Sequence, residues 1–125
     1  LRADRPGLSI LLLGDVEREA QMELVRVAAG AVTDVDVLKV AHHGSASQLP
    51  RLTALAHPAV ALIGVGCDNR YGHPAPSVVS ALDDVHAVIG RTDRHGDLAI
   101  VEVDGQARLI ARGAEQTHGP ASRCG

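Results

Sequence analysis

Five side chains that could bind a metal ion or transfer a proton each follow an apolar segment of this sequence. They are Asp15, His42, His43, His73 and Asp93. Carboxylate and neutral imidazole groups together are common ligands of Zn, Mn and Fe. A carboxylate can also bridge two metal ions about 3.5–4 Å apart, as in two-metal hydrolytic sites. These residues therefore predict a metal-dependent site, if the fold brings them to one place.

The adjacent histidines end the apolar run VLKVA and precede a glycine. If the strand continues through the pair, His42 and His43 point to opposite faces, because successive side chains of a strand alternate. One imidazole would then bind a metal while the other holds substrate or a neighbouring group. Gly44 permits a sharp turn and leaves room at the site. The residues alone do not choose between His42 and His43 as the ligand.

Each candidate also has an ordinary structural interpretation. Asp15 could cap the helix expected after it, and the histidine pair could be a surface feature. His73 and Asp93 could be turn residues. The histidines without such a context are interpreted as structural or solvent-exposed: His57, His86, His95 and His118. Only the joint occurrence at successive strand ends favours a metal site.

The composition bounds the fold and the function. The chain has 125 residues, enough for one domain or part of one, and 46% of them are hydrophobic. Because Phe and Trp are absent and Tyr occurs once, the core has to consist of aliphatic residues, as in buried sheets flanked by helices. The net charge of −3 argues against a generally basic protein that coats nucleic acid. Two cysteines are too few for a disulfide framework, and no apolar run reaches the roughly 20 residues of a membrane span.

Apolar runs and turn signals predict the elements that would position the candidate residues. Strands are expected at 8–15, 35–41, 59–66 and 86–93. Helices are expected at 16–30, 47–58 and 77–85, the last with Ser77 as its cap, and a loop at 67–76. The segments 97–105 and 106–113 predict a hairpin, and 114–125 a disordered tail.

Strands and helices alternate along this chain, which is typical of an α/β fold with helices packed on a sheet. In such sheets functional residues gather at the carboxyl ends of the strands. Here those ends carry Asp15, His42 and His43, the loop 69–73, and Asp93. One edge of the sheet is therefore expected to hold the site.

Four segments resemble, in this order, the carboxy-terminal part of the ComEC/Rec2 family of DNA internalization competence proteins. They are ILLLGDVEREAQMEL, DVLKVAHHGSAS, PAVALIGVGCDNRYGHPAPSVVSAL and GRTDRHGDLAIV, within residues 8–103. That part of the family is its metallo-β-lactamase-like domain. The resemblance implies that residues 1–113 form the C-terminal half of a metallo-β-lactamase-like αββα sandwich.

The resemblance also implies roles for single residues. Asp15 would be the carboxylate that bridges two metal ions, Zn or Mn. His43 best matches the histidine that binds one of them, with His42 next. His73 and His42 are the implied catalytic residues, and no small-molecule cofactor is implied. The implied substrate-binding residues are Ser45, Asn69, Arg70 and Tyr71.

The main metal motif of that superfamily, HxHxDH, belongs upstream of the Gly-Asp strand and does not occur in this sequence. The resemblance therefore implies about half of a dinuclear site, completed by an N-terminal half of the domain. It also implies that one apolar face of the sheet is left uncovered by this chain. The parent is expected to be an integral membrane protein with a channel. This soluble domain, without a span of its own, is expected at the outer face of the plasma membrane.

The implied function is metal-dependent hydrolysis of DNA phosphodiesters during DNA uptake, with DNA as the partner of the parent protein. Arg70 and His73 are the candidates for phosphate contact. Two alternatives stay open: an inactive structural remnant of a DNA-uptake channel, and a related phosphodiesterase with a non-nucleic substrate. Activity rests on family analogy here, and the isolated chain could be inactive.

Overall fold

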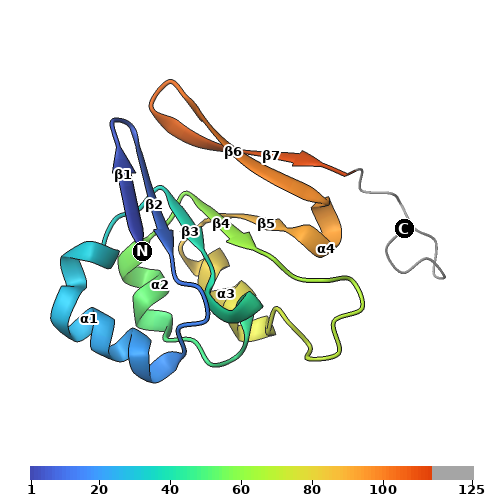
Figure 1. The fold of residues 1–125 in the computed structure, drawn as a ribbon, viewed down its shortest axis with the longest axis horizontal. Coiled ribbons are helices and arrows are strands. Elements are labelled where there is room, and N and C mark those ends of the chain that lie inside the picture. The colour runs from blue at the N-terminus through green and yellow to red at the C-terminus, as the bar shows by residue number, and fades with distance from the viewer. Residues whose placement is uncertain (114–125) are drawn as a thin grey trace.

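A computed structural model, which describes residues 1–113, has a mixed five-stranded sheet in the order β1-β2-β3-β4-β5 (Figure 1). The strands are β1 (Arg2–Arg5), β2 (Leu8–Leu12), β3 (Val37–Lys39), β4 (Val60–Ile63) and β5 (Val88–Arg91). β1 pairs antiparallel with β2, and β2 to β5 are parallel to one another. This confirms the predicted α/β class. The tail expected at 114–125 lies outside the described residues.

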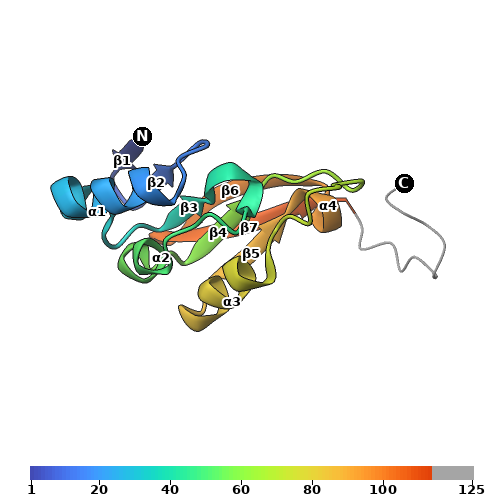
Figure 2. The ribbon, with the colours of Figure 1, turned by 90° about the horizontal axis from the view of Figure 1, so that it is seen from below.

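Three helices connect the parallel strands: α1 (Arg18–Val32), α2 (Pro50–Ala56) and α3 (Pro76–Asp84). The strands follow one another across the sheet in chain order, and such crossovers are almost always right-handed. All three helices must then lie on the same face, as Figure 2 shows. Among the described residues, no helix is both long and apolar enough to cross a membrane.

The main core lies between these helices and the sheet. It is aliphatic, and Leu38, Leu52, Ile63 and Leu82 are each at most 2% exposed. Burying a side chain of this size contributes about 1.5–3 kcal/mol. This core anchors the strands, so that the segments after their carboxyl ends start from fixed positions.

The opposite face of the sheet carries a hairpin of β6 (Asp97–Val103) and β7 (Gln106–Arg112). Leu8, Val37 and Val60 form a second buried cluster with Ala107 of this hairpin. Gly90 permits the close approach, because a Cβ there would lie 3.0 Å from a methyl carbon of Leu109. The face that was expected to be uncovered is therefore partly covered by the chain itself. The fold has three layers: helices, sheet and hairpin.

Several element boundaries differ from the sequence-based expectation. The strand expected at 35–41 ends at Lys39, and a turn of 3₁₀ type follows at Ala41–Gly44. The strand expected at 86–93 ends at Arg91, where the short helix α4 (Thr92–His95) begins. β1 was not expected, because its sequence RADR has no strand-like apolar pattern.

The expected helix caps also differ. Ser77 is not the cap of α3: Ala75 holds that position, and the helix starts at Pro76. Proline suits the first helical position because its missing N–H would have no helical partner there. α1 starts after Glu17, two residues later than expected, so Asp15 is not its cap.

Candidate functional site

The histidine pair lies in a tight turn directly after β3. His42 and His43 have φ angles of 45° and 55°, and Gly44 follows with 79°. The left-handed region is unfavourable for residues with a Cβ and persists only where the surrounding structure imposes it. The explanation of the pair by strand alternation is therefore wrong. The directions of the two imidazoles are set by the left-handed backbone conformation of His42 and His43 themselves.

This HHG turn (residues 42–44) is fastened to segments on both sides. The backbone N–H of His42 donates to the carbonyl of Gly14 at 2.8 Å, which ties the turn to the loop after β2. The carbonyl of Gly44 accepts from the N–H of Ala75 at 2.8 Å. A Cβ on Gly44 would lie 2.7 Å from the Cβ of Pro74, so glycine alone fits. Three segments distant in sequence meet at this turn.

The His43 ring is oriented by a hydrogen bond to the end of β4. Its Nδ1 lies 2.6 Å from the carbonyl oxygen of Gly64. Because a carbonyl can only accept, Nδ1 carries the hydrogen, and the neutral ring keeps its lone pair on Nε2. Metal-binding histidines are commonly oriented in this way. Because His43 is exposed, its Nε2 is accessible and could serve as one ligand of a metal ion.

His42 and His73 lie beside each other, with ring centroids 6.1 Å apart in an edge-to-face arrangement. The Nδ1 of His42 is also 3.3 Å from a carboxylate oxygen of Glu17, without the geometry of a hydrogen bond. The structure therefore brings together both predicted catalytic histidines and His43, whose centroid is 6.4 Å from that of His42.

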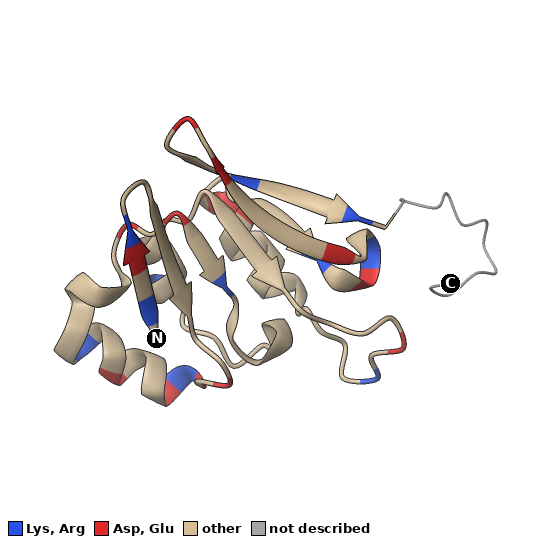
Figure 3. Ribbon diagram, turned by 45° about the horizontal axis from the view of Figure 1, so that its top comes forward, with Lys and Arg blue, Asp and Glu red and all other residues tan. Residues whose placement is uncertain are grey.

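A cleft of about 760 Å³ opens beside the HHG turn. Its polar lining comes from the end of β3, from the turn, and from the loop between β4 and α3. These residues are Lys39, His43, Asp68, Asn69, Arg70, Tyr71 and His73. Acidic and basic residues are otherwise interspersed along the ribbon in Figure 3. The cleft lining holds two cationic side chains, Lys39 and Arg70, and one carboxylate, Asp68.

Tyr71 presents an aromatic face at this cleft. It is 85% exposed and stacks on His73 with centroids 5.8 Å apart and an angle of 20° between the rings. The Asn69 side chain braces the loop between them, donating to the carbonyl of His73 at 2.8 Å and accepting from the N–H of Tyr71 at 2.9 Å. Asn69, predicted to contact substrate, therefore positions the two rings.

Lys39 is a cleft residue that the sequence-based prediction missed. It is half-buried, and its Nζ donates to the carbonyl of Val40 at 3.1 Å. Burial lowers the pKa of Lys39, and the nearby Asp15 carboxylate partly opposes this effect. A lone lysine inside the apolar run VLKVA was the available signal, since a buried strand rarely carries an ammonium group without a function or a partner.

Four predicted residues are not part of the cleft lining formed by residues 1–113: Asp15, His42, Ser45 and Asp93. His42 lies beside the cleft through its ring contacts with His43 and His73. Asp15 is exposed in the turn after β2, close enough to Lys39 to act on its pKa. Ser45 is only 6% exposed, and its Oγ has no hydrogen-bond partner among the described residues. Asp93 lies in α4 and forms an ion pair of 2.6 Å with Arg91, with both side chains about 15% exposed.

These residues fit part of a metal centre. His43 has the tautomer and exposure of a ligand. Asp15 supplies an exposed carboxylate in the loop that the Gly14–His42 hydrogen bond ties to the HHG turn. Within residues 1–113, no three His, Cys, Asp or Glu side chains lie close enough together to hold a metal ion. Catalytic zinc sites use about three protein ligands. The described residues therefore do not form a complete centre.

Comparison with curated proteins shows similarity to a competence operon protein. Over 93 residues the chain is 37% identical to ComE operon protein 3 of Bacillus subtilis (strain 168). The matched segment is 74% of this chain and 12% of the Bacillus protein, so the chain spans a small part of its relative's length. No family model and no solved structure matches the chain. The similarity to the Bacillus protein supports the relationship to competence proteins that the sequence motifs predicted.

Proposed function

We propose that this chain is part of a metallo-β-lactamase-type hydrolase that acts on DNA phosphodiesters during DNA uptake. The observation that carries the proposal is the His43 imidazole, held by the Gly64 carbonyl at 2.6 Å in the wall of a cleft with Lys39 and Tyr71. An oriented imidazole, a cation and an exposed aromatic ring are the groups that such a site requires. The 37% identity to ComE operon protein 3 supports the role in DNA uptake.

The proposed metal ligands of this chain are His43, through Nε2, and Asp15. Imidazole and carboxylate suit Zn or Mn. The remaining ligands are proposed to come from an N-terminal half of the same domain in a longer protein. A bound divalent metal lowers the pKa of water and so supplies a nucleophile at neutral pH.

The cleft residues have separate roles in this proposal. Lys39 and Arg70 bind the phosphate, and the exposed ring of Tyr71 stacks on a base. Cations combined with stacking rings are typical of sites for single nucleic-acid strands. His73 donates a proton to the departing oxygen, and His42 packs edge-on against its ring. We further propose that the parent protein spans the membrane and carries this domain at its outer face.

The test is metal titration of the purified chain, with His43→Asn and His57→Asn as a matched pair. Both histidines are exposed and have positive φ angles, 55° and 41°, but His57 ends α2 outside the cleft lining. Asparagine tolerates this backbone region, so the substitution removes the imidazole with little added strain. Calorimetric titration with Zn²⁺ and Mn²⁺ is expected to give an affinity at least about tenfold weaker for His43→Asn, and unchanged for His57→Asn.

Equal affinity in all three proteins, or no binding in any, would contradict the metal role of His43.

A fluorescently labelled single-stranded oligonucleotide, titrated into the same samples, tests the substrate. Binding that weakens in Tyr71→Ala supports DNA as the substrate. Metal binding without oligonucleotide binding would favour the non-nucleic phosphodiesterase, and neither kind of binding would favour the structural remnant.

A further inference from the structure

Beneath the site, two glutamine side chains connect the loop after β2 to the HHG turn. Gln21 of α1 is 1% exposed. Its Nε2 donates to the carbonyl of Val16 at 2.7 Å and to Oε1 of Gln48 at 2.8 Å. Its Oε1 accepts from the backbone N–H of Leu49 at 2.9 Å. Both N–H groups and the oxygen of this buried amide are therefore used.

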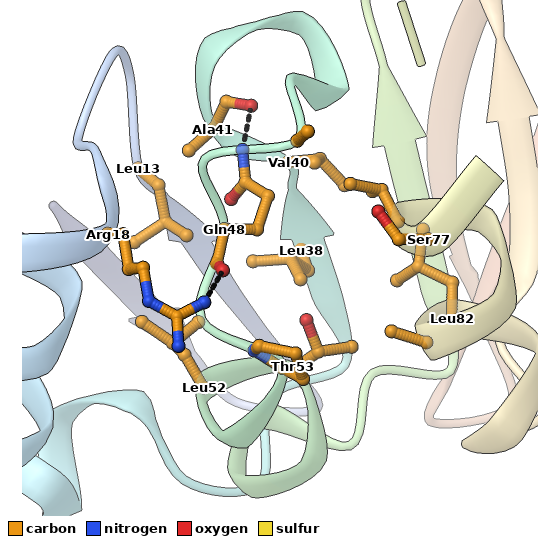
Figure 4. A pocket seen from close by; sticks show the side chains of 14 residues that line it. Leu13, Arg18, Leu38, Val40, Ala41, Gln48, Leu52, Thr53, Ser77 and Leu82 are labelled. Atoms are coloured by element: carbon orange, nitrogen blue, oxygen red, sulfur yellow. Dashed lines mark hydrogen bonds between the residues drawn. The ribbon is translucent and has the colours of Figure 1, made fainter. Parts of the chain in front are cut away.

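Gln48 completes the connection to the turn. Its Nε2 donates to the carbonyl of Ala41, the residue before His42, at 2.9 Å (Figure 4). Its own backbone carbonyl accepts from Nη1 of Arg18 at 3.1 Å (Figure 4). A continuous series of hydrogen bonds thus runs from Val16, next to Asp15, to Ala41.

The surroundings of this polar connection are apolar. Gln48 lies at a cavity of about 150 Å³ whose lining includes Leu13, Leu38 and Leu52. A buried amide is costly unless all its groups are hydrogen-bonded, and a fully bonded one is fixed in a single arrangement. Aliphatic side chains would fill this region at lower cost in desolvation. The amide pair therefore provides a defined geometry at a place where packing alone does not require one.

We infer that Gln21 and Gln48 are positioning residues that hold the HHG turn at a fixed distance from the Asp15 loop. One end of their network is the carbonyl one residue after Asp15, and the other is the carbonyl one residue before His42. The claim that this spacing matters for metal binding rests on the proposed function. The claim that the glutamines position the turn stands without the proposed function. Groups behind metal ligands typically change metal affinity by about 10–100-fold when removed.

Gln48→Met tests the inference, with Val32→Ala as the control. Methionine matches glutamine in length and removes both side-chain hydrogen bonds. Val32 is 1% exposed and is the last residue of α1, whereas Gln21 lies near the start of that helix. Truncation of Val32 to alanine is expected to destabilise the fold at a place distant from the two connected loops. Gln48→Met is expected to speed hydrogen exchange of the His42 amide about tenfold beyond the change in Val32→Ala, and to weaken Zn²⁺ binding about tenfold.

If Gln48→Met does not fold, hydrogen exchange of the His42 amide in Gln48→Glu tests the inference instead. It keeps an acceptor for Gln21 but loses the donor to Ala41, so the turn alone should be loosened. The inference is overturned if the glutamine variants lower the unfolding temperature while the His42 amide exchanges as in Val32→Ala. If wild type binds no Zn²⁺, the proposed function fails, and the exchange of the His42 amide still decides whether the pair positions the turn.

Discussion

Polar side chains are paired with each other at one end of the parallel sheet and face a cleft at the other end. At the amino ends of β2 and β3, Ser9 and Asp36 satisfy each other: the N–H and Oγ of Ser9 both donate to Asp36 Oδ2 at 2.7 Å. The N–H of Asp36 donates back to Ser9 Oγ at 2.9 Å. At the carboxyl ends, Lys39 and His43 face a cleft. One end pairs its polar groups within the sheet, and the other leaves them available to a ligand.

The backbone differs in degree. Single left-handed residues precede β3, β4 and β5 at the amino ends, namely Asp34, His57 and His86. After the carboxyl end of β3, three left-handed residues follow one another in the HHG turn. Backbone strain and incompletely paired polar groups together are typical of sites that are maintained for function at a cost in stability. The comparison therefore predicts that substitutions at the two ends separate stability from binding.

The largest expected effect is that of Gly44→Ala in the HHG turn. The new methyl group would lie 2.7 Å from Pro74 Cβ at a φ of 79°. Left-handed strain costs about 1–3 kcal/mol, and overpacking adds a similar amount, so we expect a loss of about 3 kcal/mol or more. Urea unfolding followed by circular dichroism measures the change.

Gly66→Ala is the matched control for this substitution. Gly66 lies in the cleft lining beside the HHG turn, and nothing lies within 4 Å of a Cβ there. Its free energy of unfolding is expected to change by less than about 0.5 kcal/mol. A Gly44→Ala variant as stable as wild type would mean that the turn is neither close-packed nor strained, and the contrast between the two ends would disappear.

A smaller effect is expected from Asp36→Ala at the amino end. The substitution leaves the N–H and hydroxyl of Ser9 without their acceptor in a partly buried place. The expected loss is about 1–3 kcal/mol in the free energy of unfolding, with metal and oligonucleotide affinity unchanged. Asp83→Ala, on the exposed surface of α3, is the control and should be nearly neutral. Loss of binding in folded Asp36→Ala would show that the two ends are coupled.

The sequence predicted the α/β class, most of the parallel strands and the final hairpin, because apolar runs and turn residues report burial directly. It also predicted that His42, His43 and His73 lie together, since the carboxyl ends of parallel strands share an edge. The Asp36–Ser9 pairing was not foreseen, because it depends on the register of β2 against β3.

The details of the site could not be predicted from residue types. The conformation of the HHG turn depends on contacts with Gly14, Gly64 and Pro74, which come from three other segments. A strand-end pattern assigns a place along the chain but no direction to a side chain. For this reason the burial of Ser45 was not foreseen, and Lys39 was missed as a cleft residue.

The smallest effect on stability is expected from Lys39→Met, and its sign is opposite to the others. Burial lowers the pKa of Lys39 below its ordinary 10.5, so the charged amine is less favourable in the native state than in the unfolded one. At pH values below the lowered pKa, the amine is charged in both states, and the native state is destabilised by the full free energy of burying that charge. Between that pKa and 10.5 the unfolded chain binds more protons, so stability rises with pH. Lys39→Met should therefore raise the unfolding temperature at pH 7, by an amount that shrinks as pH approaches 10.5.

The same substitution is expected to weaken oligonucleotide binding and to reduce the salt slope of the affinity by about 1, as for loss of one phosphate contact. Arg108→Met removes an equal charge from the exposed surface of β7, outside the cleft lining, and should change neither quantity. Fluorescence anisotropy at several salt concentrations measures both variants. Equal salt slopes for Lys39→Met and wild type would mean that this lysine does not contact phosphate. A gain in stability with a loss of binding is the result expected if the carboxyl end of the sheet retains a costly charge for its ligand.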